Sequence, residues 1–142
     1  MFHALLFQKS NAEILRIASI IMIVWGVIDF IAGIFLTATG GALVDDVEMD
    51  VAGAAVAIFG MAMICAGIVN AIVGLIGMKS AKQDGPHTVA FVLGIITTLG
   101  GLFTLFSSFG SGDAGQVVNG IIGLVVPALY LYGAYQLRKE AA

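Results

Sequence analysis

The chain has 142 residues, of which 60% are hydrophobic and only 11% are charged. Ordinary soluble domains carry about 25% charged residues, so this composition excludes a typical soluble globular protein and indicates an integral membrane protein. The formal net charge is −3, and the six basic residues are spread over three segments rather than forming the basic face that nucleic-acid binding needs. We therefore expect the lipid bilayer to be the chain's partner, and we expect no binding to nucleic acid.

Four long apolar stretches follow one another along the chain. Each exceeds the roughly 20 residues that an α-helix needs to cross a hydrocarbon core of about 30 Å. The sequence thus predicts an all-α integral membrane protein, a single domain over residues 1–142 built as a bundle of four transmembrane helices. The predicted spans are residues 14–39, 51–78, 88–109 and 115–137.

Local signals predict where several of these helices begin. Ser10 and Glu13 have the spacing of a capping box, which places the start of the first helix near Ser10. Asp113 can cap the fourth helix, and Pro86 suits the first turn of the third. Pro127 lies midway along the fourth span, where we expect a kink.

Positive charges lie on one side of the predicted membrane only. The two loops on the other side carry no Lys or Arg, and the first of them contains four acids within residues 45–50. We expect this acidic loop to be solvated rather than to bind a cation. The positive-inside rule predicts that both termini are cytoplasmic (N-in, C-in) and that the protein lies in the cytoplasmic membrane of a bacterium. The basic residues are Lys9, Arg16, Lys79, Lys82, Arg138 and Lys139.

Small residues recur every seven positions in the first three spans. Seven residues are two turns of a slightly underwound helix, so each set forms a seam down one helix face. In lipid such seams let backbones approach closely, and we therefore expect these residues to form helix-packing contacts. The seam residues are Ser19, Gly26, Gly33 and Gly40 in the first span, Gly53, Gly60, Gly67 and Gly74 in the second, and Gly94, Gly101 and Ser108 in the third.

The two halves of the chain contain similar segments. Residues 26–28 (GVI) match residues 94–96 (GII), and residues 67–69 (GIV) match residues 123–125 (GLV). We interpret the chain as a tandem duplication of a helical hairpin, with chance similarity between glycine-rich helices as the alternative. Each repeat would contain two spans, so the halves would be related by an axis along the membrane normal.

A track of polar residues accompanies the seams. Asp29 lies well inside the first span, where an ionised carboxylate costs at least a few kcal/mol. Its spacing from two seam glycines puts it on the seam face, so its side chain should point into the bundle. Asn70 has the same spacing in the second span and Thr97 in the third, with Thr98 beside it. Judged by depth in the membrane, Thr97 is the better-matched partner for Asp29, because Asn70 lies nearer the cytoplasm.

Two functional hypotheses follow. The first is a structural or interaction subunit that packs through its glycine seams against copies of itself or a partner membrane protein, with Asp29 neutral and hydrogen-bonded between helices. The alternative is a small proton-coupled transporter or channel subunit that uses Asp29, whose charged form burial disfavours.

Other chemistry is not indicated. The chain has no nucleophile elbow, zinc-protease motif or phosphate-binding loop, so we expect no enzyme. Two isolated histidines, His3 and His87, indicate no metal site, and no cofactor is expected. Tyr130, Tyr132 and Tyr135 near the end of the fourth span are expected to form an interfacial aromatic anchor.

Cysteine labelling in intact cells tests the orientation. Asp46→Cys and Lys82→Cys are made separately in a chain whose only cysteine, Cys65, has been replaced by Ala. An impermeant thiol reagent should label position 46 and leave position 82 unlabelled, because the basic loop is predicted to be cytoplasmic. Labelling of position 82 but not position 46 would show the opposite orientation.

Overall fold

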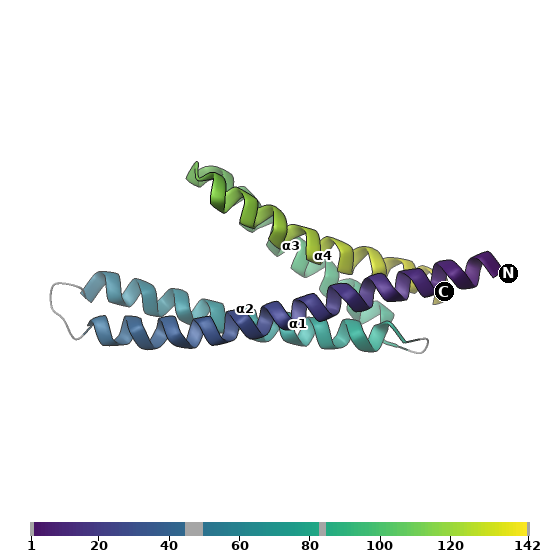
Figure 1. Ribbon diagram of the computed structural model, residues 1–142, viewed down its shortest axis with the longest axis horizontal. Coiled ribbons are helices and arrows are strands. Elements are labelled where there is room, and N and C mark those ends of the chain that lie inside the picture. Colours follow the sequence, from purple (N-terminus) through teal and green to yellow (C-terminus); the bar gives the residue numbers. More distant parts are fainter. Residues whose placement is uncertain (1, 45–49, 83–84, 142) are drawn as a thin grey trace. The chain divides into compact units, whose positions relative to one another are not determined.

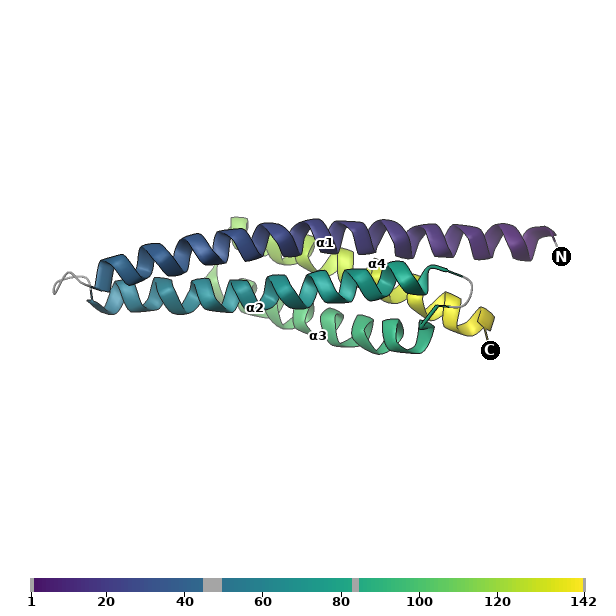
Figure 2. The ribbon, with the colours of Figure 1, turned by 90° about the horizontal axis from the view of Figure 1, so that it is seen from below.

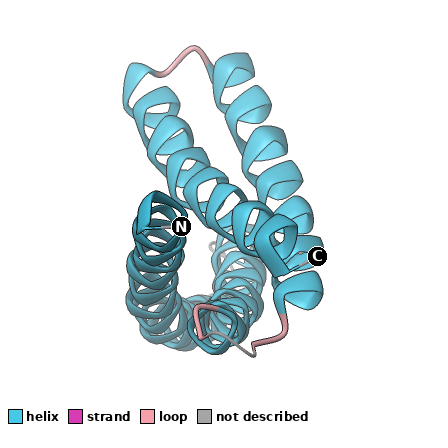
Figure 3. Ribbon diagram, turned by 90° about the vertical axis from the view of Figure 1, so that its right-hand side faces the viewer, coloured by secondary structure: helices cyan, strands magenta, loops and turns pink. Residues whose placement is uncertain are grey.

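The computed structural model describes residues 2–44, 50–82 and 85–141, and the predicted acidic loop therefore lies outside the described residues except for Asp50. In the described part of the chain every regular element is a helix and no strand is present (Figure 3). All four helices are long and apolar enough to cross a membrane, and each predicted span lies inside one of them. The prediction of an all-α chain with four helices of membrane-spanning length is thus confirmed. The helices are α1 (Phe2–Val44), α2 (Asp50–Ser80), α3 (His87–Ser111) and α4 (Ala114–Ala141).

Helix α1 begins at Phe2, so the predicted capping box is wrong: Ser10 and Glu13 lie inside a continuous helix. The residues from Phe2 to Lys9 include no Gly or Pro, so nothing in them stops the helix from extending past Ser10. With a rise of 1.5 Å per residue, the 43 residues of α1 measure ~65 Å. This is about twice the thickness of a hydrocarbon core, so α1 must extend beyond the lipid tails.

The other helix ends follow ordinary capping chemistry. Gly112 has a φ of 70° and ends α3 in the left-handed conformation that glycine adopts without steric cost. Asp113 then caps α4, because its Oδ1 accepts a hydrogen bond from the Gly115 N–H at 2.9 Å, as predicted. Pro86 is the N-cap residue of α3, and α4 runs through Pro127 without a break.

The helices pack in two compact units. The hairpin unit comprises Met22–Ile72, in which the later part of α1 runs antiparallel beside the earlier part of α2 (Figures 1 and 2). The four-segment unit comprises Met1–Ile21 and Val73–Ala142. It contains the start of α1, the end of α2, and the antiparallel pair α3 and α4, which lie side by side (Figure 1).

Tyr130 is the largest side chain in the core of the four-segment unit. It is fully buried, and its hydroxyl donates a hydrogen bond to the Val73 carbonyl oxygen at 2.9 Å. Gly77 makes room for the ring, because a Cβ there would overlap the Tyr130 ring and the Ser19 hydroxyl. Ser19 is itself buried and donates to the Leu15 carbonyl oxygen at 2.6 Å. The first and last helices are therefore joined through the end of α2.

The expectation that Tyr130 belongs to an interfacial anchor is wrong, because its side chain points into this core. Tyr130 shares one helix face with Ala134 and Leu137, at spacings of four and seven residues, and both are buried. Tyr132 and Tyr135 lie off this face and are about half exposed.

Replacing Tyr130 with Phe should destabilise the protein, because it removes a buried hydrogen bond between α4 and α2 and keeps the ring. Such bonds in membrane proteins contribute about 0.6 kcal/mol on average and at most about 1.7. The measurement is the free energy of unfolding of the purified protein in detergent. Tyr132→Phe removes an exposed hydroxyl from the same helix and is the matched control. Equal stability of the two variants would show that the Tyr130–Val73 bond contributes nothing.

Candidate functional site

Glycine contacts hold the two helices of the hairpin unit together, backbone against backbone. A Cβ on Gly26 would lie 2.6 Å from the Gly67 carbonyl oxygen, and a Cβ on Gly67 would lie 2.5 Å from the Gly26 carbonyl oxygen. No side chain fits at either position without moving the helices apart. The contact repeats every seven residues along both helices, with Gly26 facing Gly67, Gly33 facing Gly60, and Gly40 facing Gly53.

The contact between α3 and α4 in the four-segment unit is looser. Here a Cβ on each glycine would lie 3.0 to 3.3 Å from its nearest atom, and its three nearest atoms include leucine atoms. Each of these glycines therefore packs against a leucine, and a Cβ on Gly101 would also lie 3.3 Å from the Gly123 carbonyl oxygen. The pairs are Gly94 with Leu131, Gly101 with Leu124, and Gly120 with Leu105. The remaining predicted seam glycine, Gly74 of α2, is buried.

Asp29 and Asn70 meet across the α1–α2 contact of the hairpin unit. The Asn70 side chain lies within hydrogen-bonding reach of the Asp29 carboxyl group, so the expectation that Asn70 lies too far from Asp29 is wrong. Asp29 is half-buried, and Asn70 lies directly beside Gly26, whose added Cβ would be 3.2 Å from the Asn70 Cβ. Asn70 thus lies in the Gly26 layer of the glycine contact, and Asp29 lies next to that layer.

Side-chain direction explains why these two residues meet. Asp29 is about one turn beyond the layer in which Asn70 lies beside Gly26, an axial offset of roughly 4.5 Å. Every Cα–Cβ bond in a helix tilts toward the N-terminus of that helix. Because α1 and α2 run antiparallel, the Asp29 side chain leans toward the level of Asn70, and the Asn70 side chain leans toward the level of Asp29. Both tilts bring the ends of the Asp29 and Asn70 side chains closer together than the positions of their Cα atoms along the helices suggest.

The two threonines of the predicted polar track lie in the four-segment unit. The Thr97 hydroxyl donates to the Leu93 carbonyl oxygen of its own helix at 2.9 Å, a bond that many membrane-helix threonines make. The Thr98 hydroxyl oxygen is buried and has no hydrogen-bond partner. Of the four residues in the predicted track, the structure therefore brings Asp29 and Asn70 together.

One end of the four-segment unit collects polar and basic groups. The Asn11 amide of α1 donates to Glu140 Oε1 of α4 at 2.8 Å, which joins the two ends of the chain. The Ser80 hydroxyl and His87 Nδ1 form a hydrogen bond of 3.0 Å across the connection between α2 and α3. These bonds could not be foreseen from sequence spacing, since three separate segments meet here.

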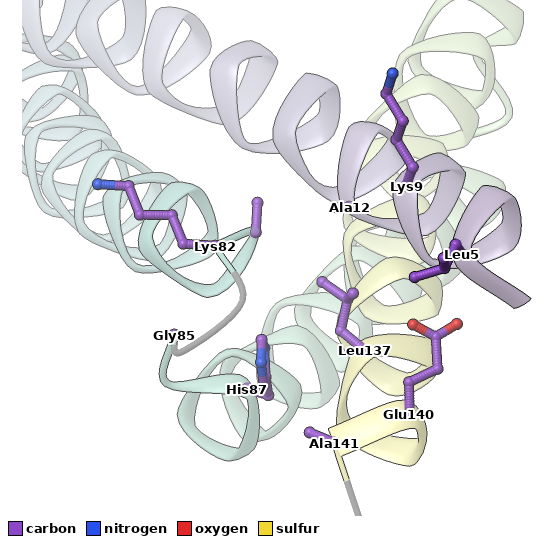
Figure 4. Close-up of a pocket in the computed structure, with 10 residues that line it drawn as sticks. Leu5, Lys9, Ala12, Lys82, Gly85, His87, Leu137, Glu140 and Ala141 are labelled. Atoms are coloured by element: carbon purple, nitrogen blue, oxygen red, sulfur yellow. The ribbon is translucent and has the colours of Figure 1, made fainter.

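Of the three hollows described at this end, the largest has a volume of about 760 Å³. Its lining combines the start of α1, the α2–α3 connection and the end of α4, and includes Lys9, Lys82, His87 and Glu140 (Figure 4). The hollow therefore presents both signs of charge. A second hollow of about 350 Å³ shares His87 with the first and adds Arg138, whose guanidinium lies 4.8 Å from the centre of the Phe91 ring.

A third hollow of about 410 Å³ lies between α1 and the end of α2 in the same unit. Arg16, Lys79 and Lys82 line it together with Leu75 and Met78, and no acidic residue of the described ranges does. Among the residues that the structure describes, five of the six basic residues of the chain and one acid line the three hollows. Most of the basic residues that set the predicted topology thus also line hollows that share lining residues.

No protein-family model matches the chain, and neither a curated protein nor a solved structure matches it. Within residues 2–44, 50–82 and 85–141, no three His, Cys, Asp or Glu side chains gather where they could hold a metal ion. The features that indicate a function are the Asp29–Asn70 pair, the glycine contacts and the basic end.

Two adjacent glycines near the end of α1 test the backbone contact. A Cβ on Gly40 would lie 2.7 Å from the Gly53 carbonyl oxygen, whereas a Cβ on Gly41 would meet nothing within 4 Å. Gly40→Ala should therefore destabilise the protein by about 1–3 kcal/mol through overpacking. Gly41→Ala should leave stability unchanged or raise it by up to about 1 kcal/mol, because alanine favours the helix. Unfolding in detergent measures both variants, and equal losses would contradict the proposed contact.

Proposed function

We propose that the chain is a non-enzymatic, multi-pass protein of the cytoplasmic membrane that serves as a structural or interaction subunit, with both termini cytoplasmic. The observation that carries this proposal is that Asp29 and Asn70 approach each other beside the glycine contact between α1 and α2. Asp29 is the only acidic residue inside the four predicted spans, and its side chain is engaged in holding two helices in register. A carboxyl group used in this way needs no substrate to explain its presence.

The seam glycines support a structural role within the chain itself, rather than the expected packing against copies or partners. Those of α1 contact those of α2, and those of α3 contact leucines of α4, so the seams hold the chain's own helices together. We propose that these contacts give the subunit a rigid frame. A second copy or a partner membrane protein would then bind a different surface from the seams.

Proton flux distinguishes this proposal from the competing one, in which Asp29 carries protons. The protein is reconstituted into vesicles containing a pH-sensitive dye, and a pH gradient is imposed. We expect no protein-dependent flux from the wild type or from Asp29→Asn, which keeps the shape and hydrogen-bonding capacity of the side chain. Asp29→Leu should instead lose about 0.6 kcal/mol of stability, and at most about 2, with the interhelical bond.

The control is Asp113→Asn, which removes a carboxylate at the exposed start of α4. A flux through the wild type that survives Asp113→Asn and disappears in Asp29→Asn would refute the structural proposal. It would also assign proton transfer to Asp29 directly.

A further inference from the structure

We propose that the third hollow, between α1 and the end of α2, binds the phosphate group of an anionic phospholipid. This site goes beyond the structural role proposed above and does not depend on it. Its lining combines three cationic side chains with two large apolar ones. The chemistry shared by possible ligands is a phosphate group, and the apolar part of the lining favours a lipid over a soluble phosphate.

The cationic side of the hollow consists of Arg16 from α1 and of Lys79 and Lys82 from the end of α2 and the turn after it. Among the described residues no acidic side chain lines this hollow, so the described part of the chain contributes only positive charges to it. Guanidinium and ammonium groups provide several N–H donors and form strong, charge-assisted hydrogen bonds with phosphate oxygens. A phosphodiester with one negative charge therefore finds more than enough positive charge and donors here.

The apolar side consists of Leu75 and Met78, which share one face of α2 with Lys79. Met78 and Lys79 lie three and four positions after Leu75, and Lys82, in the turn that follows α2, lines the same hollow. Along this face the side chains change from apolar to basic toward the end of α2. A phospholipid at the membrane interface is complementary to this face, because its acyl chains match the apolar residues and its phosphate matches the basic residues.

The acid of the neighbouring hollow does not cancel this charge. Glu140 lines the largest hollow, where its carboxylate accepts a hydrogen bond from Asn11. Lys82 lines both hollows, and Figure 4 shows its side chain extending away from His87 and Glu140. The largest hollow, with both charges, is therefore the weaker candidate for an anion, and the third hollow is the stronger.

The position of the hollow also fits a lipid headgroup. Long basic side chains near helix ends extend to the interface, where headgroups lie. Basic pockets between membrane helices on the cytoplasmic side are known to accommodate anionic headgroups, and each basic residue near an anionic surface contributes a measurable attraction. The predicted orientation places this end of the unit on the cytoplasmic side.

Lipid binding to the purified protein in a neutral detergent tests the proposal, with native mass spectrometry as the readout. The probes are phosphatidylglycerol and phosphatidylcholine with identical acyl chains. We expect the wild type to retain phosphatidylglycerol in preference to phosphatidylcholine. Lys79→Gln should weaken phosphatidylglycerol binding about fivefold, and Lys79→Gln combined with Lys82→Gln about 25-fold.

Lys139→Gln is the matched control, because Lys139 also lies in the last turn of a helix and lines none of the three hollows. It should change phosphatidylglycerol binding by less than about twofold, since a distant exposed charge is screened. Equal weakening by Lys79→Gln and Lys139→Gln, or no preference for phosphatidylglycerol in the wild type, would overturn the proposal. Displacement of the lipid by equimolar glycerol 3-phosphate would also overturn it, because it would identify a soluble phosphate as the ligand. Unfolding of each variant in detergent verifies that the fold is retained.

Discussion

Helices α1 and α2 pack with their backbones in direct contact, and this close approach follows from the solvent in which the helices associate. Lipid tails are as apolar as leucine, so helices in a bilayer gain little from burying apolar side chains against one another. They associate where dispersion contacts can form over a long, close interface, and this requires that the Cβ atoms be absent. In the hairpin unit the glycines of α1 and α2 meet this requirement at three successive layers, with carbonyl oxygens directly against the opposite glycines.

The register that these layers impose determines the polar chemistry. With Gly26 fixed against Gly67, Asn70 lies within reach of Asp29, and a costly carboxyl group obtains a partner inside the membrane. In the four-segment unit Gly77 has a comparable role, because the space it leaves admits the Tyr130 ring and allows its hydroxyl to reach Val73. In both units, glycines therefore leave the space or set the register that allows a polar side chain to reach its partner.

Much of the fold follows from the sequence, since length and hydropathy suffice to predict four helices in lipid. The spacing of seven residues also identified the glycines that face neighbouring helices, as the contacts of Gly26 and Gly67 illustrate. The Asp29–Asn70 pair was misjudged because depth was counted along each helix without regard to the direction of the Cα–Cβ bonds. The basic hollows could not be predicted, because they form where α1, α4 and the α2–α3 connection meet, and no local pattern specifies such a meeting.

The four-segment unit has a consequence for the order in which the protein can assemble during synthesis. The hairpin unit needs only residues 22–72, so its contacts can form while the second half of the chain is still being translated. The core around Tyr130 pairs the first helix with the last, and the Asn11–Glu140 bond spans 129 positions of the chain. Contacts of such high sequence separation form slowly and only after synthesis is nearly complete. Until then the buried face of Leu15 and Ser19 lacks its partner from α4. The nascent chain therefore contains a folded hairpin unit and an incomplete four-segment unit.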